Sequence, residues 1–212
     1  MKKFKEKIKK TYIDFILQNK KEPSSVNHFM DSIGEGEKSF YEHYSSFEAI
    51  KKEIWTDFIT RTLEQVKAEE VYQEYSVREK LLSFFFTLIE ILKEQRSFVV
   101  YTIDDAKKSL SLCTPTFAKG FREEFFGFAN ELIAEGFDTQ ELHSRPVISE
   151  KYPNLIWGQL VLVLKFWAKD ESENFEKTDA AIEKSINLTM DLMGLTVLDQ
   201  AFDLAKFLFQ NK

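Results

Sequence analysis

Lysines are the residues whose spacing most clearly indicates chemistry, and they gather at the amino-terminal end. The whole chain has a formal net charge of −6, with 29 basic and 35 acidic side chains. Its first 21 residues contain only two acids, Glu6 and Asp14, but eight lysines, at positions 2, 3, 5, 7, 9, 10, 20 and 21. A basic segment on an acidic chain indicates one anionic partner at that end. The alternative is a solvated helix face that only aids solubility.

Residues for covalent, metal or acid–base chemistry are scarce. The single cysteine, Cys113, excludes an internal disulfide and a cysteine-based zinc site. The sequence places none of the three histidines, His28, His43 and His143, beside it. The chain contains no phosphate-binding glycine loop, HExxH or nucleophile motif. We therefore expect no enzymatic activity, no catalytic residue, no metal and no cofactor.

The composition favours an all-α fold. Only 7 glycines and 4 prolines interrupt the chain, whereas 43% of its residues are hydrophobic and 21 are phenylalanines. Few breakers predict few turns, and so much apolar volume requires a sizeable core. No signal-peptide pattern begins the sequence and no uncharged apolar run of about 18 residues occurs. The sequence therefore predicts a cytoplasmic protein without a membrane span.

Four short helical patterns occupy about the first 50 residues. The first has an apolar stripe formed by Ile8, Tyr12, Phe15 and Ile16. Ser24 or Ser25 is the expected N-cap of the second helix, and Gly34 permits the left-handed turn that ends it. A third helix contains Phe40, and Ser45 with Glu48 predicts a capping box for the fourth. Short helices separated by a glycine turn are typical of a helix-turn-helix.

The rest of the chain predicts a bundle of longer helices. A capping box of Ser76 and Glu79 precedes a helix to about Gln95 that is apolar on nearly every side, which indicates burial. Glycines 136 and 194 are the expected caps of two later helices. The remaining predicted helices cover residues 97–110, 116–135, 153–169, 174–193 and 196–209.

The segments Ser25–Gly34 and Ser39–Ile50 resemble the DNA-binding domain of the tetracycline-repressor (TetR) family. The aromatic-rich recognition segment corresponds to Phe40-Tyr41-Glu42-His43-Tyr44, and the entry to the fourth helix to Ser46-Phe47-Glu48-Ala49-Ile50. The resemblance implies a three-helix helix-turn-helix domain over residues 1–48. It implies a helical ligand-binding and dimerisation domain over residues 49–212, giving about nine to ten helices in all.

The same resemblance implies a function. Members of the family are ligand-responsive regulators, commonly repressors, that bind a near-palindromic operator in double-stranded DNA as homodimers. The residues that would face DNA are Ser25, Asn27, His28, Lys38, Ser39, Tyr41, His43 and Lys51.

Three departures from the family pattern concern DNA binding. Glu35-Gly36 follows the turn glycine in place of an apolar residue and serine, Glu37 replaces a basic or small residue, and Phe47 replaces a phosphate-contacting lysine. Residues 22–50 carry six acids and one base, Lys38. Because DNA affinity depends largely on neutralising phosphates, this acidity opposes binding. A TetR-fold protein that binds a hydrophobic or lipid-like molecule without binding DNA is therefore the alternative.

The predicted body offers a ligand site and a dimer surface. Phenylalanines 84, 86, 121 and 125 could line a pocket for a small apolar ligand, or could simply fill the core. Residues 166–172 also resemble part of a lipid-binding protein of ubiquinone biosynthesis, which suggests a lipid-like ligand. The helices at 153–169 and 174–193 are the expected homodimer surface, because the first is too apolar to remain exposed.

Overall fold

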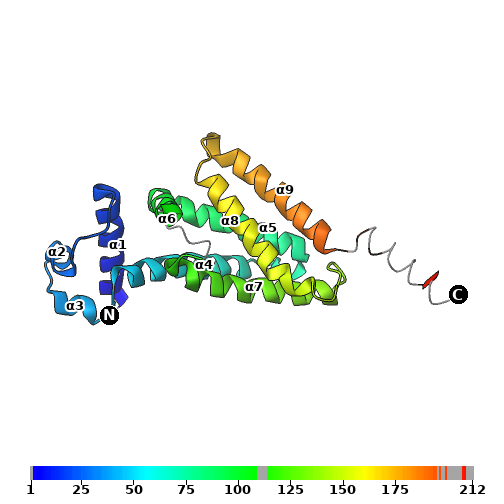
Figure 1. The fold of residues 1–212 in the computed structure, drawn as a ribbon, viewed down its shortest axis with the longest axis horizontal. Coiled ribbons are helices and arrows are strands. Elements are labelled where there is room, and N and C mark those ends of the chain that lie inside the picture. The colour runs from blue at the N-terminus through cyan, green and yellow to red at the C-terminus, as the bar shows by residue number, and fades with distance from the viewer. Residues whose placement is uncertain (1, 109–113, 195, 197–198, 200–206, 209–212) are drawn as a thin grey trace. The chain divides into compact units, whose positions relative to one another are not determined.

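Every regular element in the described part of the chain is a helix (Figure 1). The computed structural model describes residues 2–108, 114–194, 196, 199 and 207–208. The α-helices are α1 (Lys2–Asn19), α2 (Val26–Asp31), α3 (Glu37–Tyr41), α4 (Phe47–Lys67), α5 (Val77–Lys93), α6 (Arg96–Lys108), α7 (Lys119–Asp138), α8 (Tyr152–Trp167) and α9 (Glu176–Met193). Single 3-10 turns at Tyr72–Glu74, Thr116–Ala118, Ser149–Lys151 and Glu173–Phe175 precede α5, α7, α8 and α9. The predicted all-α class is confirmed. Among the described helices, none is long and apolar enough to span a bilayer.

The chain divides into two compact units. The first consists of Met1–Thr62 and Leu88–Glu124, and the second of Leu63–Thr87 and Phe125–Lys212. Helices α4, α5 and α7 each contribute a segment to both units. The functional boundary expected between residues 48 and 49 stays a prediction.

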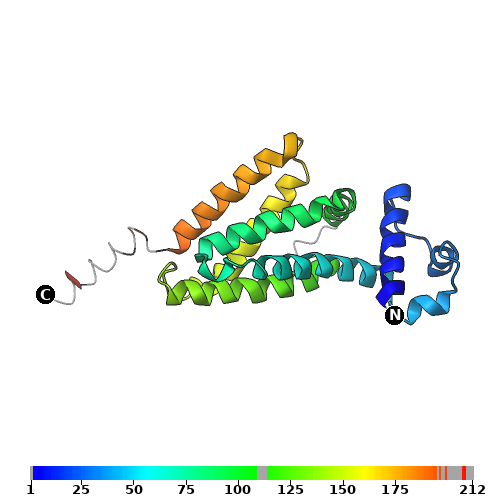
Figure 2. The ribbon, with the colours of Figure 1, turned by 180° about the vertical axis from the view of Figure 1, so that it is seen from behind.

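Aromatic and aliphatic side chains of α1 organise the first unit. Ile8, Tyr12 and Ile16 are completely buried, which confirms the predicted stripe. Tyr12 lies edge-on to Phe29 of α2 and to Phe98 of α6, with ring centroids 6.4 Å apart in both pairs. Figures 1 and 2 show α2 and α3 lying against α1. Burial of this one face therefore holds the short helices on the first helix.

Helices α8 and α9 form an antiparallel pair in the second unit (Figures 1 and 2). Their facing side chains are buried and mostly aliphatic: Ile156, Leu160 and Val163 on α8, and Ile182, Ile186 and Met190 on α9. A polar contact also joins them, the amide of Gln159 donating to the hydroxyl of Ser185 at 3.1 Å. Because these side chains face each other, the opposite sides of α8 and α9 point outwards.

The buried carboxylate of Asp170 shapes the turn between these two helices. It accepts hydrogen bonds from the backbone N–H and hydroxyl of Ser172, at 2.9 and 2.6 Å, and from the same groups of Thr178, also at 2.9 and 2.6 Å. Burial acts to raise the pKa of Asp170, but these four donors outweigh it and lower the pKa to about 2.

Replacing Asp170 by Asn should therefore destabilise the protein in a pH-dependent way. Hydrogen bonds to charged groups stabilise more than neutral ones, so we expect the free energy of unfolding at pH 7 to fall by about 2 kcal/mol. Because the folded pKa is depressed, the stabilisation exists above the unfolded pKa and is lost as pH falls through the folded value. The difference in free energy of unfolding between the two proteins, measured by urea denaturation, should shrink as the pH falls from about 5 to about 2. A constant difference across that range would contradict the prediction.

Most of the helix caps predicted from the sequence are confirmed. Ser25 caps α2, and Ser76 with Glu79 forms the predicted box, the backbone N–H of Ser76 donating to Glu79 at 2.8 Å and that of Glu79 to Ser76 at 3.3 Å. Gly194 is the C-cap of α9. The predicted last helix lies almost wholly outside the described residues.

Two capping predictions were wrong. Helix α4 begins at Phe47 and is capped by Ser46, whose hydroxyl accepts from the backbone N–H of Ala49 at 3.2 Å. The cap lies one residue later than predicted, so Ala49 and not Glu48 stands at the third helical position, and Glu48 pairs with Lys51. Gly136 lies inside α7, which continues to Asp138. A Cβ at Gly136 would lie 2.5 Å from Cγ of Leu142, so close packing explains this glycine.

Candidate nucleic-acid interface

The turn between α2 and α3 has the geometry of a helix-turn-helix. At the start of α2, the hydroxyl of Ser25 accepts from the backbone N–H of His28 at 3.2 Å. At its end Gly34 takes a left-handed conformation, with φ of 80°, as predicted. The backbone N–H groups of Gly34 and Glu35 then donate to the carbonyls of Asp31 and Met30, both at 3.1 Å. This is a Schellman motif, which stops α2 and reverses the chain before α3.

Four aromatic rings pack beneath α3 and hold this helix in place. Phe47 stacks on Tyr12 with ring centroids 5.8 Å apart, and its edge contacts to Phe29 and Phe40 are 5.3 and 5.4 Å. Phe40 itself is completely buried. Phe47, the residue that replaces the family's lysine, is half-buried, and its ring packs on the core and supports α3.

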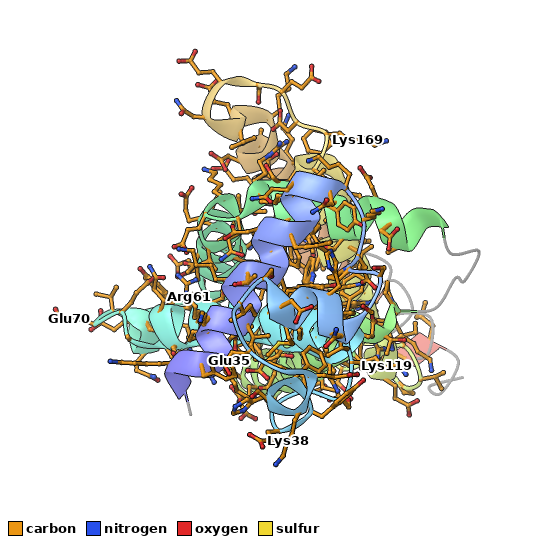
Figure 3. The ribbon with its side chains drawn as sticks, turned by 90° about the vertical axis from the view of Figure 1, so that its left-hand side faces the viewer. Glu35, Lys38, Arg61, Glu70, Lys119 and Lys169 are labelled. Carbon is orange, nitrogen blue, oxygen red and sulfur yellow. The ribbon has the colours of Figure 1, made fainter. Side chains whose placement is uncertain are left out.

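The predicted contact residues fall on or beside the exposed surface of this motif. Ser25, Asn27, His28, Lys38 and Tyr41 are exposed, while Ser39 and His43 are half-buried. Figure 3 shows Lys38 projecting outwards from α3, with Glu35 on the turn that precedes this helix. Successive helical residues are about 100° apart, so Lys38 and Glu42 lie on the side of α3 opposite Phe40.

Aromatic neighbours restrict three of these side chains. The ring of His43 lies 5.2 Å from that of Phe4 on α1, and the ring of His28 lies 6.5 Å from that of Phe15. Tyr41 contacts the buried Phe40 edge-on at 5.4 Å, yet is 56% exposed. Contact with Phe40 therefore supports the ring of Tyr41 while the residue stays exposed.

Lys51 lies in a different environment from the other predicted residues. It is only 6% exposed, and its ammonium lies 2.7 Å from Glu22 and 3.2 Å from Glu48. It also lies 5.6 Å from the ring centroid of Phe117. Burial acts to lower the pKa of Lys51, but the two carboxylates outweigh it and the pKa lies above its ordinary value. In this conformation Lys51 is charged, paired internally and withdrawn from the surface.

Two amino-terminal lysines are paired internally as well. The ammonium of Lys5 lies 2.8 Å from Glu53 on α4. That of Lys9 contacts Asp57, lies 2.7 Å from Glu6, and is 3.6 Å from Glu53. Burial acts to lower the pKa of Lys9, but these carboxylates raise it above its ordinary value.

The other amino-terminal lysines whose side chains the structure describes are exposed. Lys7 donates to the carbonyl of Ile33 at 3.2 Å, which places it beside the turn between α2 and α3. The remaining exposed lysines of this end are Lys3, Lys10, Lys20 and Lys21. Sequence reasoning did not identify the partners of Lys5 and Lys9. Only the i, i+3 spacing of Glu6 and Lys9 signalled a pair, because Glu53 and Asp57 are distant in the chain.

An apolar groove follows the outer face of α8 and α9. Its volume is about 830 Å³, and its lining includes large exposed apolar side chains: Leu155, Leu162, Phe166, Leu188 and Leu192. These residues fall within the two helices predicted to form the homodimer.

The four phenylalanines predicted to line a pocket have different surroundings. Phe84 and Phe125 are completely buried and lie together in the second unit, with ring centroids 5.4 Å apart. Phe86 is half-buried. Phe121 belongs to the first unit and packs on Trp55 at 5.7 Å. Their role in binding a ligand stays a prediction.

An amino-terminal helix-turn-helix followed by a longer all-helical region defines a class of transcription regulators. The family "Tetracyclin repressor-like, C-terminal domain" matches residues 80–208, which is more than half of the chain. The protein therefore belongs to the TetR family of transcription regulators, as the sequence predicted.

Solved structures support the same fold. A TetR-family transcription regulator from Shewanella sp. PV-4 has a TM-score of 0.63 and 15% identity, over 91% of this chain and 98% of that one. A bacterial regulatory protein of the TetR family from Rhodococcus RHA1 has a TM-score of 0.58 and 14% identity, over 91% of this chain and 97% of that one. No curated protein matches the chain.

Proposed function

We propose that the protein is a dimeric, ligand-responsive repressor that binds a near-palindromic operator in the cytoplasm. The observation that carries this proposal is the α2–turn–α3 geometry, in which a Schellman motif and an aromatic core hold α3 with an exposed outer face. A rigid, exposed helix of this kind is what a helix-turn-helix inserts into the major groove. As a regulator of this family, the protein is proposed to act by binding and not by catalysis.

The proposed contacts are those that the surface allows: Ser25, Asn27, His28, Lys38, Ser39, Tyr41 and His43. Lys51 is left out because its ammonium is buried between Glu22 and Glu48. Lys3, Lys7 and Lys10 are added as phosphate contacts, since they are exposed on α1 and Lys7 adjoins the turn. Lysines supply affinity through phosphate, whereas side chains on α3 select the sequence.

Selection from random duplexes at low salt tests this proposal. We expect enrichment of a near-palindrome, because a two-fold dimer presents two copies of α3. The triple variant Lys3→Gln, Lys7→Gln, Lys10→Gln should weaken binding to every sequence and reduce the salt slope by about 0.9 for each phosphate that is no longer neutralised. Tyr41→Phe and His43→Ala should instead alter the preferred sequence, by about 1–3 kcal/mol per base contact. Enrichment of no sequence would count against the repressor.

The homodimer is proposed to form through α8 and α9. Its support is the groove lined by exposed apolar residues on both helices, since an apolar patch of that kind usually marks an interface. Two such helix pairs can close an isologous four-helix contact.

The ligand is proposed to be an elongated apolar molecule bound near Phe84, Phe86 and Phe125. The support is the apolar, aromatic character of this part of the second unit. Native mass spectrometry of the purified protein should reveal a lipid or aromatic compound that co-purifies with it. An interior shown to be fully packed in the ligand-free protein would contradict this part of the proposal.

A TetR-fold protein that binds a hydrophobic molecule and does not bind DNA is the second candidate. Two observations favour it: Asp31, Glu35, Glu37 and Glu42 are all exposed, and the ammonium of Lys51 is withdrawn. The selection experiment separates the candidates, because this protein would enrich nothing while still carrying its ligand.

A further inference from the structure

Two carboxylates of α4 pair with lysines of α1, and one of these lysines, Lys5, is accessible enough to meet DNA. Glu53 contacts Lys5 at 2.8 Å and Lys9 at 3.6 Å, and Asp57 also contacts Lys9. Glu53 projects from α4 towards α1, and both helices belong to the first unit. The pairs therefore form within the unit that contains the helix-turn-helix.

These pairs have the chemistry of a lysine–phosphate contact. A carboxylate and a phosphate both present anionic oxygens to an ammonium, so the two groups compete for the same donor. Burial acts to raise the pKa of Glu53, but Lys5 and Lys9 lower it below its ordinary value, and it remains ionised at neutral pH. The side chains of Lys5 and Glu53 are 36% and 30% exposed. Pairs this exposed are weak, so a phosphate can replace the carboxylate.

We propose that Glu53 is an internal competitor of DNA phosphate, which withholds Lys5 and so reduces the affinity of the protein for DNA of any sequence. This inference rests on the proposed DNA-binding function and describes its regulation.

The consequence concerns sequence discrimination. Non-specific affinity grows with the number of phosphates neutralised, whereas base contacts from α3 are made only at the right sequence. Withholding Lys5 lowers the non-specific contribution and leaves the contribution of the base contacts unchanged. The phosphate contribution to affinity is then small. A protein with an acidic α3 region therefore stays bound only at its operator, where base contacts add to that contribution.

Glu53→Gln tests the proposal, with binding to a short duplex of random sequence measured by fluorescence anisotropy. Between about 50 and 200 mM salt, the slope of log affinity against log salt should steepen by about 0.9, because Lys5 then neutralises one more phosphate. Affinity at about 100 mM salt should rise roughly tenfold.

Asp14→Asn is the matched control. Asp14 is an exposed acid on α1 that pairs with no lysine in the described part of the chain, so its replacement changes the net charge equally without releasing a cation. The salt slope of this variant should equal that of the unmutated protein.

A second measurement does not depend on DNA. Brief acetylation with a water-soluble succinimidyl ester, followed by mass spectrometry, should label Lys3 and Lys10 several-fold faster than Lys9 in the unmutated protein. Glu53→Gln should accelerate labelling of Lys5, while circular dichroism shows unchanged helix content. Equal labelling of Lys5 in both proteins would overturn the proposal.

The outcomes distinguish this inference from the function it rests on. If the unmutated protein binds DNA and Glu53→Gln binds with the same slope, the inference fails and the repressor remains. If neither protein binds any duplex at low salt, the proposed function fails and the inference fails with it.

Discussion

Leu162→Glu is expected to convert the protein from a dimer into a monomer. Leu162 is 68% exposed in the single chain and lies in the apolar groove on α8 and α9. An isologous contact would bury the new carboxylate twice, without a partner, and burying an unpaired charge costs several kcal/mol. We expect the dissociation constant of the dimer to rise by at least about 100-fold, which corresponds to roughly 3 kcal/mol. Sedimentation velocity at micromolar concentration measures the change.

Val71→Glu is the control for this substitution. Val71 is also a large, exposed apolar residue of the second unit, but it does not line the groove. The same change there should leave the dimer intact. A monomer in the unmutated protein at micromolar concentration would contradict the proposed interface directly.

Phe84→Ala is expected to produce the largest loss of stability. Its side chain is 0% exposed, and its ring stacks on Phe128 at 4.8 Å and contacts Phe125 at 5.4 Å. Removing a buried phenylalanine forfeits its transfer free energy and leaves a cavity, at a cost of about 3–5 kcal/mol. Urea denaturation of the two proteins measures this difference.

The same experiment tests the role of the phenylalanines in ligand binding. A ring that faces an existing cavity packs against fewer atoms, so a cost well below about 3 kcal/mol would place Phe84 itself at the wall of the ligand pocket, whereas the expected cost places it behind that wall. Phe86→Ala is the matched comparison, because Phe86 is half-buried and its removal should cost less. If Phe86→Ala and Phe84→Ala lowered the free energy of unfolding equally, the conclusion that Phe84 is more tightly packed than Phe86 would be wrong.

Helices, turns and their caps were determined largely by the sequence itself. The stripe of Ile8, Tyr12 and Ile16, the cap at Ser25 and the left-handed Gly34 all depend on interactions within a few residues. Such interactions follow from helical periodicity and local hydrogen bonding, which are visible in the order of residues. The family resemblance then supplied the arrangement of the helices, and a solved structure that aligns over 91% of the chain supports the same fold.

Which charges are available at the surface was decided only by the tertiary structure. The sequence predicts Lys5, Lys9 and Lys51 to be equivalent to any other lysine of a basic region, but each pairs with a carboxylate: Glu53, Asp57 and Glu22 respectively. Glu53 and Asp57 are each 48 residues from the lysines they hold. Gly136 is a comparable case, since its packing against Leu142, and not a helix end, explains the residue. Pairs and close approaches of this kind depend on how helices pack, and no local periodicity encodes them.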